Sequence, residues 1–291
     1  MATSTEITRK DGRRVAAHFP AEGRSGRTVV LCHAAPGSGG FDPDPEQTAA
    51  RDVTLLGVDR PGYGGSEPMP AEDWASVAVA ADDLAEVLDQ LGTGPVGVAG
   101  WSAGGRVALA LAARRPDLVT RVAVLATPAP DDAVAWVPPE HKAALEAMRG
   151  QPAAQVHAAL GEQLAGFQAG DPAQALALLG AEAADEPVLA RPGARQRLTE
   201  LLSAAFAQGV VGLAADIAGY SLQPWGFEPA EVTAKTLLLY GADDPVAGPA
   251  HGRWYRRQLP DARYEQVPAA GHLLVIPMWR RVLSHLAPNP R

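Results

Sequence analysis

One serine in this sequence stands in a setting that can make it a nucleophile. Residues 98–105 are VAGWSAGG, so Ser102 lies in a G-x-S-x-G pattern with small residues two positions before and after it. An apolar run typical of a strand precedes the serine, and the segment RVALALAA is typical of a helix. A tight turn at such a junction strains the serine backbone and projects the hydroxyl at the N-terminus of the helix. The alternative is an ordinary structural turn, because short matches to this pattern also occur by chance.

A hydroxyl group is a poor nucleophile unless a base takes its proton and an acid orients that base. The sequence offers candidates for both after Ser102, each at the end of an apolar run. Two carboxylates stand in LLLYGADDPV, and His272 stands in QVPAAGHLL. Asp243 and Asp244 compete for the role of the acid. We favour Asp244, because the following Pro245 biases its backbone away from the helical region, whereas Asp243 could cap the turn.

Five other histidines do not stand at the end of an expected strand. We interpret each of them as a surface or packing residue. They are His18 in an early hairpin, His141 and His157 on helices of the middle segment, His251 at the start of a helix and His285 in the last helix. His272 is therefore the candidate base.

The segments around these residues alternate between strand-like and helix-like patterns. A hairpin is expected over 5–19, where Asp11-Gly12 supplies the turn. Strands are expected within 28–37, 52–66, 94–102, 120–130, 234–244 and 262–272, and helices within 71–92, 103–116, 252–259 and 277–286. Nearly continuous aliphatic strands that alternate with helices indicate an α/β fold, with a mostly parallel sheet covered on both faces.

The middle of the chain breaks this alternation. Residues 128–225 are rich in Ala, Leu and Gln and show no strong strand pattern. Four or five helices are expected there, within 141–148, 153–168, 172–183, 194–208 and 210–220. Nearly a hundred residues is too long for a simple connection between a strand and a helix. We therefore predict a core made of residues 1–127 and 226–291, with 128–225 inserted as a helical lid.

Composition narrows the class of protein. The chain has 291 residues, of which 47% are hydrophobic and 20% charged, as in a globular protein. A net charge of −8 without clustered Lys and Arg argues against a nucleic-acid partner. A single cysteine excludes an intrachain disulfide. No secretion signal or membrane-spanning run is evident, so we expect a cytoplasmic protein that does not bind membranes. The oligomeric state is not predicted.

Five motifs in order along the chain resemble those of the α/β-hydrolase superfamily, in its lid-bearing, esterase-like branch. LCHAAPGSGG resembles the family's HG-x-P-G loop, VDRPGYGGS its D-x-P-G-x-G-x-S loop, and AGWSAGG its nucleophile elbow. YGADDPV resembles the acid loop and AAGHLL the histidine loop. The resemblance covers the chain except the interior of the lid. One departure is His33-Ala34, where the family has His-Gly.

The resemblance implies a cofactor-free and metal-free serine hydrolase. Ser102 would be the nucleophile, His272 the base and Asp244 the acid that orients the base. The backbone N–H groups of Ala35 and Ala103 would form the oxyanion hole.

The same resemblance suggests supporting roles near these loops. His33 would brace its loop through hydrogen bonds, and Asp59 and Arg60 would lock loops together beneath the site. Cys32 would be a packing residue.

The expected reaction is hydrolysis of a carboxylic ester of a small molecule. Cleavage of an amide, a thioester or a carbon–carbon bond is the alternative on the same triad. Haloalkane and epoxide chemistry is disfavoured, because related proteins of those classes carry an aspartate in place of Ser102. A non-catalytic protein of the same fold that binds a small ligand is the alternative outside enzymes.

The walls of the substrate pocket are expected to come from the lid, because the catalytic loops offer mostly small residues. The tentative pocket residues are Trp101, Trp136, Phe167 and Phe206, together with leucines at 160, 164, 178 and 213. Two alternatives remain open. Trp101 could plug the fold instead, and the lid residues could pack only against one another.

Overall fold

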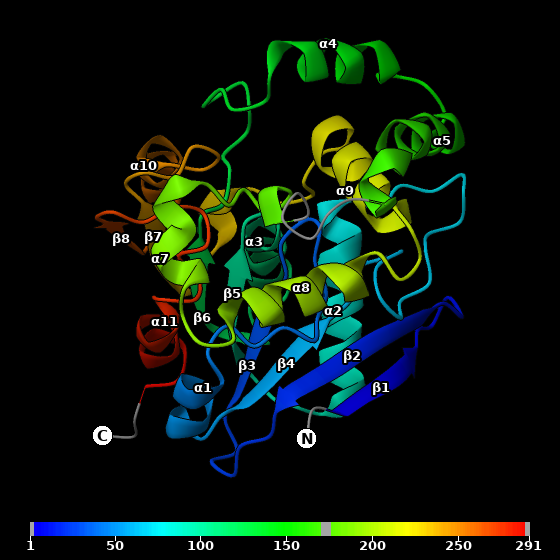
Figure 1. Ribbon diagram of the computed structural model, residues 1–291. Helices are drawn as coiled ribbons and strands as arrows, with labels where there is room; N and C mark the ends of the chain where they lie inside the picture. Colours follow the sequence, from blue (N-terminus) through cyan, green and yellow to red (C-terminus); the bar gives the residue numbers. More distant parts are fainter. Residues whose placement is uncertain (1–2, 170–175, 289–291) are drawn as a thin grey trace.

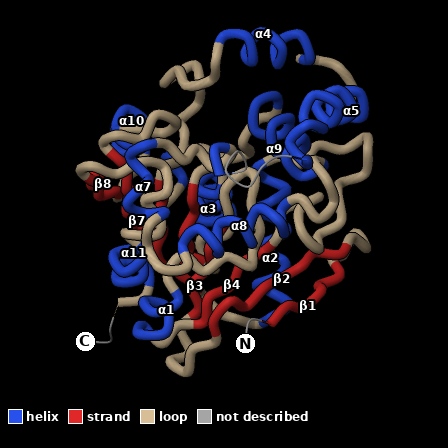
Figure 2. The backbone as a smooth tube through the Cα atoms, viewed as in Figure 1, coloured by secondary structure: helices blue, strands red, loops and turns tan. Residues whose placement is uncertain are grey.

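Eight strands form a single sheet in the order β1-β2-β4-β3-β5-β6-β7-β8 (Figures 1 and 2). The computed structural model describes residues 3–169 and 176–288. The strands are β1 (Thr3–Thr8), β2 (Arg14–Ala21), β3 (Thr28–Cys32), β4 (Thr54–Val58), β5 (Val96–Trp101), β6 (Val119–Leu125), β7 (Lys235–Gly241) and β8 (Ala262–Val267). The β1–β2 and β2–β4 pairs are antiparallel and every later pair is parallel. The predicted mostly parallel sheet is confirmed.

Helices lie on both faces of this sheet. Those of the α/β part are α1 (Pro45–Arg51), α2 (Val77–Leu91), α3 (Gly104–Arg114), α10 (Pro249–Gln258) and α11 (Trp279–Leu286). The faces follow from the period of a strand, since successive side chains point to opposite sides. Val30 and Cys32 pack with α2 and α3, whereas Val29 and Leu31 pack with α11. Alternate side chains of β3 therefore contribute to two apolar cores, one on each face of the sheet.

The inserted segment is helical in its described part. It contains α4 (Pro139–Met148), α5 (Ala153–Leu164), α7 (Glu186–Leu189), α8 (Ala194–Ala205) and α9 (Val211–Leu222), with short 3-10 turns η1 (Ala165–Ala169) and η2 (Ala183–Asp185). A third 3-10 turn, η3 (Pro229–Glu231), precedes β7. The helix expected within 172–183 begins outside the described residues, and α1 and α7 were not predicted. Helices α4, α5 and α9 gather at the top of Figure 1, beyond the sheet. The extent of the lid, 128–225, stays our proposal.

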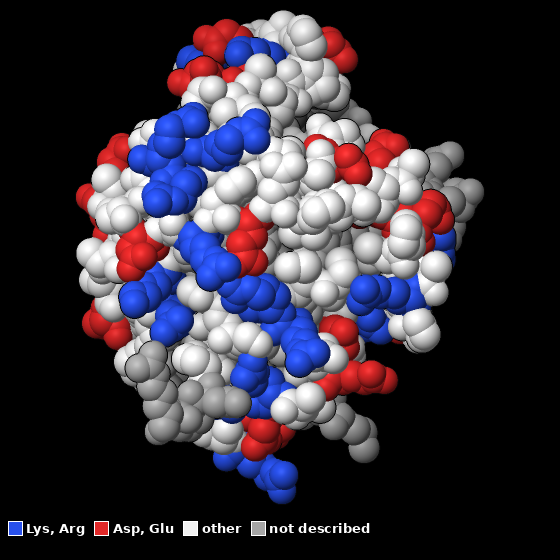
Figure 3. Space-filling view, turned by 90° about the vertical axis from the view of Figure 1, so that its left-hand side faces the viewer, with Lys and Arg blue, Asp and Glu red and all other residues white. Residues whose placement is uncertain are grey.

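Charge is unevenly distributed over the surface. Lys and Arg side chains form a band on the face shown in Figure 3, which is the left-hand side of Figure 1 and carries α10, β8 and α11. Exposed basic residues on or beside these elements are Arg253, Arg256, Arg257, Arg263 and Arg280. Among the described residues, no helix combines the length and the apolar character needed to cross a bilayer.

A buried histidine joins the start of the insertion to the α/β part. His251 of α10 is 5% exposed, and its Nδ1 accepts a hydrogen bond of 3.0 Å from the backbone N–H of Ala129. Burial lowers the pKa of His251 to about 4. Its packing role is confirmed, and the side chain is neutral in the folded protein at neutral pH.

We predict that this histidine makes stability depend on pH. Between pH 6.5 and about 4 the unfolded chain binds a proton at His251 that the folded chain does not, so stability falls as the pH falls. The effect should reach about 1–3 kcal/mol. In His251→Asn, whose side-chain oxygen can replace the Nδ1 acceptor, urea unfolding at a series of pH values should show a flatter profile. Parallel profiles for the two proteins would contradict this assignment.

Candidate active site

The turn that carries Ser102 is set by two close backbone approaches. A Cβ atom on Gly104 would lie 2.1 Å from the carbonyl oxygen of Cys32, and one on Gly100 would lie 2.3 Å from the carbonyl oxygen of Gly104. Neither position can therefore hold a side chain. Ser102 has φ of +53°, a left-handed conformation that is rare for a residue other than glycine. The junction of β5 and α3 thus forces the hydroxyl out of the strand.

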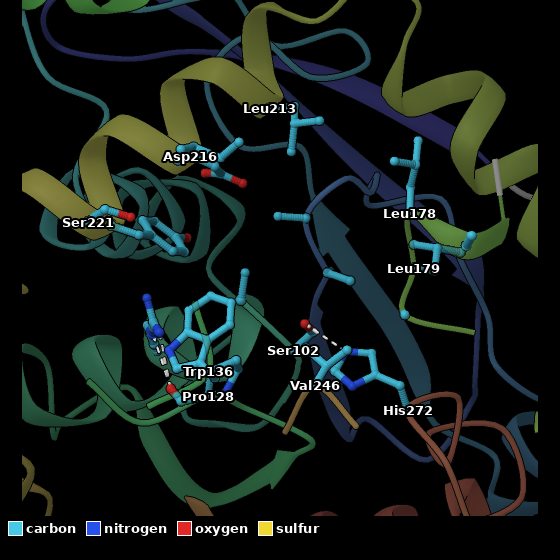
Figure 4. Close-up of a pocket in the computed structure, with 18 residues that line it drawn as sticks. Ser102, Pro128, Trp136, Leu178, Leu179, Leu213, Asp216, Ser221, Val246 and His272 are labelled. Carbon is cyan, nitrogen blue, oxygen red and sulfur yellow. Dashed lines mark hydrogen bonds between the residues drawn. The ribbon is translucent and has the colours of Figure 1, made fainter. Parts of the chain in front are cut away.

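Three side chains from three separate loops meet beside this turn. His272 Nε2 lies 2.9 Å from Ser102 Oγ (Figure 4), and His272 Nδ1 lies 2.9 Å from Asp244 Oδ2. With Asp244 ionised, Nδ1–H donates to the carboxylate and leaves Nε2 free to accept the hydroxyl proton. The structure therefore brings together the three residues that the sequence predicted as nucleophile, base and acid.

The two candidate acids differ clearly in environment. Asp244 is buried, and its Oδ1 accepts hydrogen bonds of 2.8 and 2.9 Å from the N–H groups of Val246 and Ala247. Burial alone would raise the pKa of Asp244, but the contact with His272 and these N–H groups outweigh it, so the pKa lies below 3.8. Asp243 is exposed. Of these two aspartates, only Asp244 forms a hydrogen bond with the imidazole of His272.

All four polar atoms of His272 are held in place. Its ring nitrogens bond to Ser102 and Asp244, as above. Its backbone N–H donates to Asp185 Oδ2 at 3.1 Å, and its carbonyl oxygen accepts from the indole N–H of Trp101 at 2.9 Å. His272 is 2% exposed. The position of the imidazole is consequently fixed both through its ring and through its backbone.

Asp185 is a residue of the site that sequence reasoning missed. It ends η2 in the inserted segment, and its other oxygen accepts 2.9 Å from the N–H of Leu273. Burial raises the pKa of this carboxyl above 3.8, although the hydrogen bonds from Leu273, Glu182 and His272 oppose the shift. The spacing of Glu182 and Asp185 is that of a capping box, which the structure contains. That signal predicts a helix start, and nothing in the sequence connects it with His272.

The two residues whose backbone N–H groups are expected to form an oxyanion hole both lie at the site. Ala35 and Ala103 line the cavity next to Ser102. Neither N–H donates to an acceptor within the described part of the chain. Ala103 directly precedes α3, where helix N–H groups lack partners and favour negative charge. The two N–H groups can therefore donate hydrogen bonds to a substrate oxygen that gains negative charge during a reaction.

An ion pair with the lid holds the loop that carries Ala35. Arg60 donates 2.6 Å to the carbonyl oxygen of His33 and 2.8 Å to that of Ala34. The same guanidinium bonds to Asp216 of α9, with a shortest distance of 2.6 Å, and Tyr63 donates 2.9 Å to this carboxylate. The expected locking role of Arg60 is confirmed, and the structure adds its partner on the lid.

The other expected braces are present as well. His33 Nε2 accepts 3.2 Å from the N–H of Arg60, so Nδ1–H donates 2.7 Å to the carbonyl oxygen of Ala34. Asp59 accepts 2.7 Å from Gly39 N–H and 2.9 Å from Gly65 N–H. Burial raises the pKa of the Cys32 thiol to about 12, which fits a packing residue.

Ser102 and His272 open onto a cavity of about 310 Å³. In Figure 4, Leu178 and Leu179 lie on one side of these two residues, whereas Trp136, Asp216 and Ser221 lie on the other. The cavity lining, within the described residues, is Ala34, Ala35, Ser102, Ala103, Arg106, Pro128, Trp136, Ala177, Leu178, Leu179, Gly180, Leu213, Asp216, Ile217, Tyr220, Ser221, Val246 and His272. One side is thus aliphatic and the other carries polar groups.

Only one of the four tentative pocket residues, Trp136, lines this cavity. Trp101 is fully buried, because it ends β5 with its side chain on the face opposite the loop of Ala103, and it supports His272 from beneath. Phe206 packs with Tyr63 and Leu213 beneath α9. The structure places neither residue at the cavity, and for Trp101 it favours the alternative that the residue plugs the fold. Phe167 is 45% exposed and borders a neighbouring chamber instead.

Two further chambers share walls with the cavity. An apolar chamber of about 430 Å³ shares Ala35, Leu178, Leu213 and Ile217 with it. A more polar chamber of about 330 Å³ shares Arg106, Trp136, Tyr220 and Ser221. The space beside Ser102 therefore borders one apolar and one polar chamber.

The sheet, the strand-end loops and the Ser-His-Asp arrangement are those of an α/β hydrolase. The family described as alpha/beta hydrolase fold matches residues 27–277. A pimeloyl-[acyl-carrier protein] methyl ester esterase of Chromobacterium violaceum is 32% identical over 252 residues, which cover 85% of this chain and 87% of that protein. The sn-1-specific diacylglycerol lipase ABHD11 of Mus musculus is 28% identical and is matched over 75% of this chain and 65% of its own.

A solved structure agrees at the level of the fold. The structure of a thermophilic esterase from Thermogutta terrifontis superposes with a TM-score of 0.70 at 23% identity, over 97% of this chain and 96% of that one. The chain belongs to the α/β-hydrolase family, and it is an esterase of the serine-hydrolase type.

We predict that Asp185 supports the reaction through the backbone of His272. Asp185→Ala leaves two buried N–H groups without an acceptor, which should lower the free energy of unfolding by about 1–3 kcal/mol. The loosened imidazole should lower kcat while KM stays nearly unchanged. Steady-state kinetics well below the unfolding temperature would test this. Glu186→Ala, an exposed neighbour, is the matched control. Loss of stability with an unaltered kcat would restrict Asp185 to a packing role.

Proposed function

We propose that Ser102, His272 and Asp244 hydrolyse a carboxylic ester through an acyl-enzyme. The observation that carries the proposal is the unbroken hydrogen-bond chain from Asp244 to His272 to Ser102, with both distances 2.9 Å, at the wall of the cavity. Nucleophile and base within hydrogen-bond reach, with a third group orienting the base, is the arrangement that activates a serine.

In the first half of the reaction, Ser102 Oγ attacks the ester carbonyl carbon and its proton passes to His272 Nε2. Asp244 stabilises the imidazolium that forms. The carbon–oxygen bond to the alcohol then breaks, and the proton on Nε2 goes to the leaving alkoxide oxygen. The products of this half are a free alcohol and an acyl group on Ser102.

In the second half, a water molecule gives a proton to His272 Nε2 and attacks the acyl carbon. The bond between this carbon and Ser102 Oγ breaks, and the proton returns to the serine. In both halves the carbonyl oxygen becomes an oxyanion that the N–H groups of Ala35 and Ala103 would stabilise. Each such donor is typically worth about 10²–10³ in rate.

The proposed substrate is a small ester with an aliphatic part. A cavity of about 310 Å³ is at the lower end of the range for small-molecule sites, and Leu178, Leu179 and Leu213 give it an apolar wall. The Chromobacterium relative is named for a methyl ester of an acyl group. By extension we propose an ester of a small alcohol. Amide, thioester and carbon–carbon substrates remain the alternatives for a substrate panel, and the cytoplasmic location stays a prediction.

Removing the nucleophile should abolish the reaction. Ser102→Ala should keep the fold and lose about 10⁶ of the kcat for ester hydrolysis. The native protein should also be labelled covalently by a fluorophosphonate probe, and the variant should not. An inactive but labelled variant would place the reactive hydroxyl elsewhere. Activity above a few per cent in a preparation free of other hydrolases would refute the mechanism.

Neighbouring aspartates give a matched pair of variants. Asp244→Asn should lower kcat by roughly 10⁴, because an amide cannot hold the required imidazole tautomer. Asp243→Asn changes the charge equally at an exposed position and should retain nearly full activity. Kinetics of both variants on one ester measure the difference. Equal, small losses would mean that another carboxylate orients His272.

A further inference from the structure

Three arginines of the described chain are more than nine-tenths buried, and one of them lacks an acidic partner. Arg13 is bonded to Asp83, and Arg60 is bonded to Asp216. Arg106 is 5% exposed, yet no described carboxylate lies within 4.0 Å of its guanidinium. Burying a charge is costly unless another group compensates it. The uncompensated cation therefore calls for an explanation.

The immediate contacts of Arg106 orient its guanidinium without neutralising it. Nε and Nη2 donate to the carbonyl oxygen of Pro128 at 3.3 and 3.1 Å. The guanidinium carbon lies 4.6 Å from the ring centre of Trp225, 5.7 Å from that of Tyr220 and 5.9 Å from that of Trp136. Aromatic faces attract a cation and hold it flat, but they bring no negative charge. A hydrogen bond also joins Arg106 to the side chain of Tyr255, which is neutral and likewise brings no negative charge.

Arg106 stands where the cavity of Ser102 meets the polar chamber, and it lines both. It follows Ser102 by four residues and lies in the first turn of α3. Asp216, the acid that also lines the cavity, is already engaged by Arg60 and Tyr63. The polar side of the cavity thus has a spare positive charge close to the nucleophile.

We propose that Arg106 binds a carboxylate carried by the ester substrate, so that the preferred substrates are esters with a free carboxylate on one of their two parts. The planar guanidinium matches a carboxylate through parallel N–H groups, and its five N–H groups outnumber the bonds that Pro128 and Tyr255 take up. The leucine side of the cavity would hold the apolar part. This inference rests on the proposed esterase function and narrows its substrate class.

A purely structural role for Arg106 makes a different prediction. If its only work is to hold Pro128 and stack on Trp225, a substitution should change the hydrolysis of charged and neutral esters by the same factor. A carboxylate site should instead change their ratio. The comparison must therefore be made within each variant, where the neutral ester reports folding and the triad.

The kinetic test compares kcat/KM for monomethyl esters of dicarboxylic acids, from succinate to suberate, with that for the dimethyl esters. A second arm uses acetyl esters of hydroxycarboxylic acids, which carry the carboxylate on the alcohol part, beside their methylated forms. In Arg106→Gln the charged-to-neutral ratio should fall about 10- to 100-fold in one arm. Arg106→Lys should keep part of the preference. Arg256→Gln, an exposed position with the same change in charge, should keep all of it.

A binding measurement separates failure of this proposal from failure of the esterase function. By calorimetry, wild-type protein should bind a free dicarboxylate of the preferred length more tightly than the uncharged diol of the same length, which is not a substrate, and Arg106→Gln should lose this difference. No turnover is needed, and the wild-type comparison stands even if the variant does not fold. Equal binding of the two ligands by the wild type, or a common factor for charged and neutral esters in Arg106→Gln, would overturn the proposal.

Discussion

The site depends on how closely two backbone segments approach at the end of β5. The turn at Ser102 fits against β3 only because residue 104 has no side chain, and it folds back on itself only because residue 100 has none. This contact gives the serine its left-handed backbone and directs its hydroxyl away from the sheet. It also places Ala103 at the wall of the cavity. The proposed nucleophile and one of the two proposed oxyanion donors are therefore positioned by a single packing constraint.

His272, in contrast, is not positioned by one local constraint. It is held by several hydrogen-bond partners that are far apart in the sequence. Its ring bonds to the strand-end residues Ser102 and Asp244, and its backbone bonds to Trp101 below and to Asp185 of the insertion. The insertion is thus more than a cover for the cavity. It supplies an acceptor without which the histidine loop would have buried N–H groups lacking a partner.

What could be predicted from sequence followed from local signals at strand ends. Ser102, Asp244 and His272 each stand where an apolar run stops, and parallel strands bring such ends to one edge. Trp101 was left open between pocket and core, because an aromatic residue next to Ser102 suggests a pocket, whereas the alternation of a strand turns it to the opposite face. Asp185 and Arg106 escaped for another reason. Tertiary packing gives Asp185 its partners at the histidine loop and leaves Arg106 without an acidic partner. Neither a capping pattern nor an arginine in a helix indicates such contacts in the sequence.

The ion pair between Arg60 and Asp216 limits how the inserted segment can be exchanged between members of the family. Arg60 bonds to the carbonyl groups of His33 and Ala34, so the loop that presents Ala35 is steadied by a charge whose counter-ion belongs to α9. A chimaera that received another protein's insertion without a carboxylate at this position would leave a buried guanidinium unbalanced. The position of the Ala35 N–H would then change, although the exchange replaced neither Ala35 nor any residue of the triad. The inserted segment therefore cannot be exchanged as an independent unit unless the carboxylate on α9 is kept.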